Sequence, residues 1–141
     1  MKSITKLMCL IVFSLPFLVH AGYTQPAPVI IDLDNNIAYG DMMTARWTKG
    51  DDTFIGCGIR HYQGGFVFGF CQAQDDDGEL AYCQTQDAVL LESMKSMADN
   101  SFITYSWNDD GECTRIGFSN QSFYINKDNP SFANKNKNKN P

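Results

Sequence analysis

The stretch TFIGCGIRHYQGGFVFGFCQAQDDDGELAYCQ, residues 53–84, decides the fold because two glycine-containing turns divide it into three strand-like runs. Polar and apolar residues alternate within each run, which is the pattern of a β-strand. The turns are Gln63–Gly65 and Asp76–Gly78, where glycine takes a positive φ without a Cβ clash. We therefore predict three antiparallel strands, over Thr53–Tyr62, Phe66–Gln74 and Glu79–Gln84.

The register of these two hairpins brings cysteines together. A turn centred on Gly64 places Cys57 opposite Cys71, and the second turn places Cys71 opposite Cys83. Directly opposed residues in a non-hydrogen-bonded pair lie near disulfide distance. Because Cys71 can take only one partner, two pairings with Cys113 follow: 57–71 with 83–113, which we favour, and 71–83 with 57–113. The cysteines are therefore expected to be structural.

The other face of the same strands is rich in bulky apolar side chains. These are Phe66, Phe68, Phe70, Leu80 and Tyr82. Gly56 and Gly58 oppose Gln72 and Phe70, so that an aromatic ring can lie over bare backbone. We expect this face to be the core beneath a covering helix. The alternative is an exposed aromatic platform for a ligand or partner.

The covering helix is predicted over Asp87–Ala98, where the alternation stops. Its apolar residues recur at helical spacing, and Asp87 or Thr85 can cap its start. A second hairpin is expected from Phe102–Trp107 and Glu112–Phe118. Short strands are expected over Met42–Trp47 and Phe123–Ile125. The fold class is α+β: one small antiparallel sheet of about five to six strands, one covering α-helix and two disulfides.

The two ends of the chain differ from this domain. Residues 1–21 have a basic start, a short apolar run and a small-residue cleavage site, as in a secretory signal peptide. Residues 22–36 are an extended lead-in, residues 37–126 form a single domain, and residues 127–141 are a disordered Lys/Asn-rich tail. The apolar run is too short for a membrane span, which needs about 20 residues. We expect a secreted, extracellular bacterial protein that passes through the periplasm and carries no transmembrane segment.

The composition excludes some classes of function. Apolar residues make up 43% of the 141 residues and aromatic residues 13%, which suffices for a packed core. Residues 22–130 contain 16 acidic and 6 basic side chains. Such a charge opposes binding to nucleic-acid phosphates, so no nucleic-acid partner is predicted. We expect a monomer.

No catalytic or metal-binding motif is present in the mature sequence. His61 is its one histidine, and no nucleophile elbow, P-loop or zinc-protease motif accompanies it. The acidic turns at 75–78 and 108–111 resemble EF-hand fragments but lack the first ligand and the bidentate acid. The cysteine spacing does not suit zinc. No metal and no cofactor are predicted.

The segment Ser101–Tyr124 resembles the C-terminal part of short secreted domains of Gram-negative bacteria. Those domains have a Phe/Ser-x-Trp, an acidic-Gly turn, Cys-Thr and a closing Asn-x-Ser-x-Tyr. This segment has Tyr-Ser-Trp at 105–107 and then the turn, the Cys-Thr and the closing motif, and the upstream cysteines fit the same pattern. The resemblance covers about 70 residues, and its motifs are structural. Such domains are largely of unknown function, and some are similar to type II secretion substrates of intracellular pathogens. Small domains of that kind act on or bind host material, which implies a role in virulence.

We therefore expect a non-catalytic, effector-like protein that binds a host protein or a surface glycan. The candidate binding residues are exposed aromatics and hairpin-tip residues: Arg60, His61, Tyr62 and Trp107. The alternative is a small secreted hydrolase that uses carboxylates together with His61. A pocket that contains His61 and two carboxylates would favour the alternative.

Overall fold

The structure is a computed structural model that describes residues 23–48 and 52–125. Its elements, in chain order, are β1 (Ile30–Asp32), β2 (Ile37–Asp41), α1 (Met42–Trp47), β3 (Phe54–His61), β4 (Val67–Gln74), β5 (Leu80–Thr85), α2 (Ala88–Lys95), β6 (Phe102–Trp107), β7 (Cys113–Ser119) and the 3-10 helix η1 (Ser122–Tyr124). The predicted signal peptide and Lys/Asn-rich tail lie outside the described residues. The protein is mostly β, in the broad α+β class.

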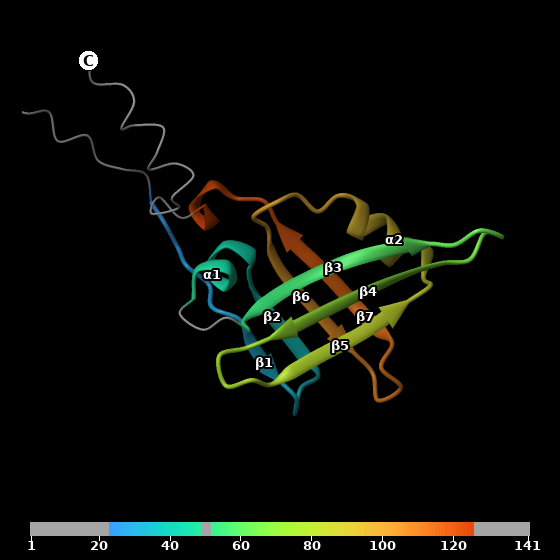
Figure 1. Ribbon diagram of the computed structural model, residues 1–141, viewed down its shortest axis with the longest axis horizontal. Helices are drawn as coiled ribbons and strands as arrows, with labels where there is room; N and C mark the ends of the chain where they lie inside the picture. The colour runs from blue at the N-terminus through green and yellow to red at the C-terminus, as the bar shows by residue number, and fades with distance from the viewer. Residues whose placement is uncertain (1–22, 49–51, 126–141) are drawn as a thin grey trace, which may run out of the picture.

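The strands form two antiparallel sheets, where we predicted one. The four-stranded sheet has the order β1-β2-β6-β7, and the three-stranded sheet has the order β3-β4-β5. The described residues thus hold seven strands, more than the five to six predicted. The additional pair is β1 and β2, and β1 lies inside the segment predicted as a lead-in. The two sheets lie face to face with their strands crossing (Figure 1).

The three-stranded sheet has the predicted register. Cys57 pairs with Cys71, and Cys71 pairs with Cys83, across neighbouring strands. The disulfides are Cys57–Cys71, within the sheet, and Cys83–Cys113, which links β5 to β7 of the other sheet. The favoured pairing is confirmed. One disulfide therefore holds a hairpin, and the other holds the two sheets together.

Helix α2 confirms the predicted helix, and Asp87 is its cap. The Asp87 carboxylate accepts hydrogen bonds from the backbone N–H groups of Val89 and Leu90, both at 2.9 Å. The helix contacts strands of both sheets. A Cβ at Gly69 would collide with side chains of α2, so this glycine permits the close approach of helix and strand.

Two short elements differ from the prediction. Residues 42–47 form helix α1, because the buried Asp41 carboxylate accepts the N–H of Thr44 at 2.6 Å and caps a helix there. The buried residues of this helix, Met43 and Ala45, are spaced as in a strand, which explains the wrong prediction. Residues 122–124 form η1, not a strand.

The core lies between the two sheets, and β4 and β5 contribute only small residues and cysteines to it, namely Cys71, Ala73, Ala81 and Cys83. Cys71, Cys83 and Ala73 are completely buried, and they face the buried Ile103 and Tyr105 of β6. The Tyr105 hydroxyl donates a hydrogen bond to the carbonyl oxygen of Ala81 at 2.9 Å and so joins the sheets. No described helix is long and apolar enough to cross a membrane.

The expectation that the aromatic face forms the core is therefore wrong. Helix α2 and the second sheet both pack on the face of β4 that carries Gly69 and Cys71. Side chains alternate between the faces of a strand, so burial of this face leaves the bulky residues outside. The physical reason is that small residues and disulfides give a flat surface on which other elements can pack closely.

Candidate functional site

An exposed row of aromatic side chains covers the outer face of the three-stranded sheet. We call this row the aromatic platform, and its members are Tyr62, Phe66, Phe68, Phe70 and Tyr82. Tyr62, Phe66 and Tyr82 are each more than half exposed, at 55%, 51% and 51%. Leu80, at 65% exposed, precedes Tyr82 on the same face of β5. Exposed apolar patches of this kind mark interaction surfaces.

The rings of the platform contact one another in sequence across the sheet. Tyr62 stacks on Phe68 with a centroid separation of 6.1 Å, and Phe68 lies 6.2 Å from Phe70. Phe70 then stacks on Tyr82 of the next strand at 6.3 Å, with the planes 23° apart. Such ring pairs attract each other beyond the area that they bury. The platform is thus a contiguous surface rather than a set of separate exposed rings.

Glycine in β3 lets one ring lie against the sheet. A Cβ added at Gly58 would lie 3.0 Å from the Cζ atom of Phe70, so that the ring occupies the space above this glycine. The predicted placement of an aromatic ring over bare backbone is confirmed. The Arg60 guanidinium lies over the same ring, with its Cζ atom 4.8 Å from the centroid. This cation–π contact holds Arg60 on the platform.

Amide side chains supply the polar part of this face. On this face Gln72 and Gln74 follow Phe70 along β4, and Gln84 follows Tyr82 along β5. Arg60 is the one charged residue among the outward-facing positions of the three described strands. The surface therefore combines aromatic rings with neutral groups that both donate and accept hydrogen bonds.

The structure brings together two of the four predicted binding residues. Arg60 and Tyr62 both lie on the platform. His61 lies between them in sequence, so its side chain points to the opposite face of the hairpin. Trp107 is half-buried against the core, where its ring lies 5.7 Å from that of the buried Tyr105.

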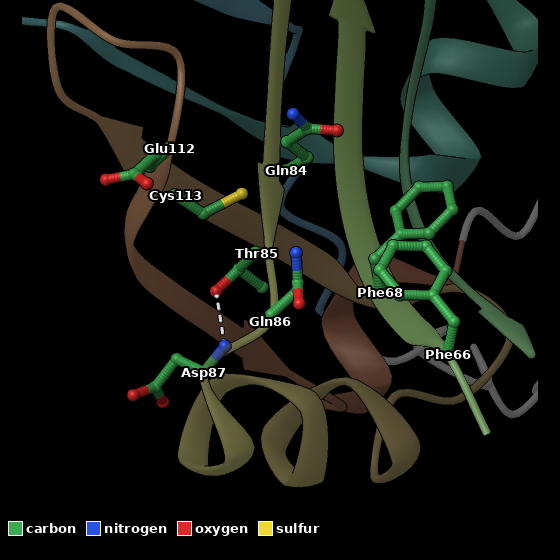
Figure 2. A pocket seen from close by; sticks show the side chains of 8 residues that line it. All are labelled: Phe66, Phe68, Gln84, Thr85, Gln86, Asp87, Glu112 and Cys113. Atoms are coloured by element: carbon green, nitrogen blue, oxygen red, sulfur yellow. Dashed lines mark hydrogen bonds between the residues drawn. The ribbon is translucent and has the colours of Figure 1, made fainter.

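A pocket of about 490 Å³ continues the platform past the end of β5. It is lined by Phe66, Phe68, Gln84, Thr85, Gln86, Asp87, Glu112 and Cys113, as Figure 2 shows. Two carboxylates are thus present, but His61 is not among the lining residues. The three groups required by the alternative hydrolase hypothesis do not meet in this pocket.

The acidic turns have a structural explanation. The Asp75 carboxylate accepts the backbone N–H of Glu79 at 2.9 Å, and the Asn108 side chain accepts that of Glu112 at 2.8 Å. Gly78 and Gly111 close these turns with positive φ values of 83° and 75°. These hydrogen bonds are those expected of tight turns that begin with Asp or Asn.

Among the described residues, the ligand atoms that cluster closely enough for a metal are the sulfurs of Cys71, Cys83 and Cys113. All three sulfurs are in disulfides. The thiolate is the form of cysteine that binds metals, so the cluster offers no ligand while the disulfides are intact.

A second group of aromatic residues lies on the outer face of the four-stranded sheet. Phe102 stacks on Tyr124 of η1 at 5.3 Å and contacts Tyr39 at 6.4 Å. Phe102 and Tyr124 are only partly exposed, because η1 lies on this part of the sheet. These aromatic contacts hold η1 against the four-stranded sheet. By contrast, no described helix covers the platform.

The platform could be predicted in part from residues 66–70, because the sequence FVFGF places three aromatic rings on one face of a strand. The pocket had no such signal, because it is assembled from three separate segments of the chain. Comparison of the chain with protein-family models, with curated proteins and with solved structures found no match.

Proposed function

We propose that this is a secreted polysaccharide-binding protein without catalytic activity and that the aromatic platform is its binding surface. The observation that carries the proposal is a contiguous row of exposed and partly exposed rings that contact one another on one face of a sheet. A pyranose ring presents C–H groups on its faces and hydroxyl groups around its edge. The C–H groups are attracted to the electron-rich face of an aromatic ring, and the hydroxyl groups suit amide partners.

The polar residues favour a glycan over a host protein as the ligand. Protein interfaces bury a central apolar anchor in a matching pocket. The platform instead distributes its rings over β4, β5 and the two residues that flank the β3–β4 turn, with Gln72 beside Tyr82 and Gln84 beside Phe70. Amides that are exposed on a rigid strand lose little conformational freedom when they bind a hydroxyl group.

The location proposed for the protein agrees with this function. Two disulfides hold the described domain, and disulfides persist in oxidising compartments such as the periplasm and the extracellular space. Polysaccharides of cell surfaces and extracellular matrices are accessible there. Export of the mature chain follows from the predicted signal peptide and is part of the proposal.

Titration calorimetry with soluble hexasaccharides of glucose and of N-acetylglucosamine tests the proposal. Tyr82→Ala removes a ring that is 51% exposed, and we expect an affinity about two- to tenfold weaker because stacking contacts contribute about 0.5–1.5 kcal/mol each beyond the area they bury. The matched control is Tyr23→Ala, since Tyr23 is 74% exposed but contacts Phe123 rather than the platform.

Binding that Tyr82→Ala weakens and Tyr23→Ala leaves unchanged would support the platform as the site. Equal effects of the two variants would contradict it. If neither oligosaccharide binds the native protein and a peptide or protein binds tightly, the glycan proposal is wrong and the ligand is a protein.

A further inference from the structure

Three cysteine sulfurs from three different strands lie together in the core. The Sγ atoms of Cys71, Cys83 and Cys113 are all within 4.8 Å of one another. Cys83 and Cys113 are bonded to each other, whereas Cys71 is bonded to Cys57. The two disulfides are therefore neighbours, and the sulfur of Cys71 lies close to both sulfurs of the disulfide that joins the sheets.

The four disulfide-bonded cysteines differ in their access to solvent. Cys71 and Cys83 are completely buried and Cys113 is 6% exposed, whereas Cys57 is partly exposed. Cys57 also lies on β3, which is an edge strand of its sheet. Access is one of the factors that decide which sulfur of a disulfide a thiolate attacks. A small thiol that approaches from solvent therefore reaches the sulfur of Cys57 before those of the other three.

We propose that Cys57 is a site of S-thiolation by low-molecular-weight thiols such as glutathione, and that this modification rearranges the disulfide between the sheets. The thiolate of the small molecule attacks the sulfur of Cys57 and forms a mixed disulfide with it. The Cys57–Cys71 bond breaks, and Cys71 leaves as a thiolate with the bonding electrons. This thiolate is released beside the Cys83–Cys113 disulfide.

The freed Cys71 thiolate then attacks Cys83. These two residues are direct partners across β4 and β5, and the Cα atoms of such partners are about 4.5–5.5 Å apart, which a disulfide can span. The attack requires the Cys71 side chain to rotate about its Cα–Cβ bond into line with the disulfide. The Cys71–Cys83 bond forms and the Cys83–Cys113 bond breaks. Cys113 leaves as a thiolate and takes up the proton that the small thiol lost.

The exchange is balanced, and it changes how the sheets are joined. One thiol is consumed and one is formed, so that no oxidant or reductant is needed. A thiolate in an apolar core lacks hydration, whereas Cys113 lines the pocket at the end of β5. The new disulfide lies within the three-stranded sheet, so the covalent link between β5 and β7 is lost.

Treatment of the oxidised native protein with reduced glutathione tests the modification. Acid quenching, alkylation of free thiols and mass spectrometry of unreduced peptides identify the products, because a basic or acidic cleavage site lies between each successive pair of cysteines. We expect a glutathione adduct on Cys57, a Cys71–Cys83 disulfide and one alkylated Cys113 for each adduct. An adduct accompanied by alkylated Cys71 and an intact Cys83–Cys113 disulfide would overturn the exchange. The absence of an adduct on Cys57 would overturn the whole proposal.

Two variants that lack the same disulfide isolate the role of the sulfur cluster. Cys57→Ser leaves Cys71 as a free thiol within the cluster, and we expect it to form the Cys71–Cys83 disulfide and a free Cys113 without any added thiol. Cys71→Ser is the matched control, because the thiol that it leaves, on Cys57, lies outside the cluster. This control should keep the Cys83–Cys113 disulfide intact.

The comparison of these two variants separates exchange from a general loss of stability, which affects both because both lack the hairpin disulfide. Rearrangement in Cys57→Ser alone supports the proposal. A Cys83–Cys113 disulfide that stays intact in both variants would overturn it. Rearrangement to the same extent in both would also overturn it, because the exchange would then not depend on the position of Cys71.

Discussion

Tyr105→Phe removes a single hydroxyl group that joins the two sheets. Tyr105 lies completely buried on β6, and its hydroxyl donates a hydrogen bond to the Ala81 carbonyl of β5 at 2.9 Å. A hydrogen bond contributes about 0.5–1.5 kcal/mol net, and the loss rises to about 3 kcal/mol where a buried group is left unpaired. We therefore expect the free energy of unfolding to fall by about 1–3 kcal/mol.

Calorimetry and urea unfolding under non-reducing conditions measure this change. For a domain of about 100 residues, each 1 kcal/mol lowers the Tm by about 4–8 °C. The m-value should stay constant, because the variant exposes the same surface when it unfolds. Tyr23→Phe is the control, since it removes a hydroxyl from a residue that is 74% exposed.

The same variant has a distinctive dependence on pH. Burial raises the pKa of Tyr105 above its ordinary value of 10.0, so the folded protein holds the neutral phenol after the unfolded chain has ionised. The stability that this residue contributes is complete below about pH 10 and falls as the pH rises from there toward the raised pKa. The deficit of Tyr105→Phe relative to the native protein should therefore shrink above about pH 10.

Two results would refute this reasoning. One is a Tyr105→Phe variant as stable as the native protein at neutral pH, which would mean that the hydroxyl does not join the sheets. The other is a deficit that stays constant from about pH 8 to about pH 11, which would mean that burial does not hold the phenol neutral.

Three further predictions concern other contacts. Asp41→Asn should lower the free energy of unfolding by about 1–3 kcal/mol in urea, because one amide oxygen cannot replace both oxygens of a buried, hydrogen-bonded carboxylate. Cys83→Ala with Cys113→Ala should lower it by about 2–5 kcal/mol in calorimetry, since this disulfide links the sheets. Asn35→Ala should raise the pKa of Asp32 toward its ordinary value in an NMR titration, because the Asn35 amide stabilises the carboxylate.

Each of these predictions has a control within the chain. Asp34→Asn alters an exposed turn and should leave stability unchanged; an equal loss would contradict the role given to Asp41. Cys57→Ala with Cys71→Ala should lower the free energy of unfolding by less than loss of the other disulfide does. The Cys57–Cys71 disulfide lies within one hairpin, and its cysteines are separated by 14 residues rather than 30. A pKa of Asp32 that Asn35→Ala leaves unchanged would show that the backbone hydrogen bonds of the turn suffice.

Local sequence signals determined the β3-β4-β5 sheet, its register and its disulfide. The glycine turns set the pairing of Cys57 with Cys71 and of Cys71 with Cys83, because the register of a hairpin follows from its turn. Helix α2 could also be predicted from the sequence, because its cap, Asp87, and its apolar residues at helical spacing lie within a short segment. These features depend on contacts between residues close in sequence, and a single sequence contains them directly.

The tertiary structure alone decided which face of that sheet is buried. Alternation divides each strand into two faces, and both faces of β4 are apolar, one with Phe68 and Phe70 and the other with Gly69 and Cys71. The choice depends on what packs against the sheet: the second sheet, formed when β2 pairs with β6 across about 60 residues, and helix α2. These elements fit closely on small residues and disulfides, so the large aromatic rings remain outside and form the platform.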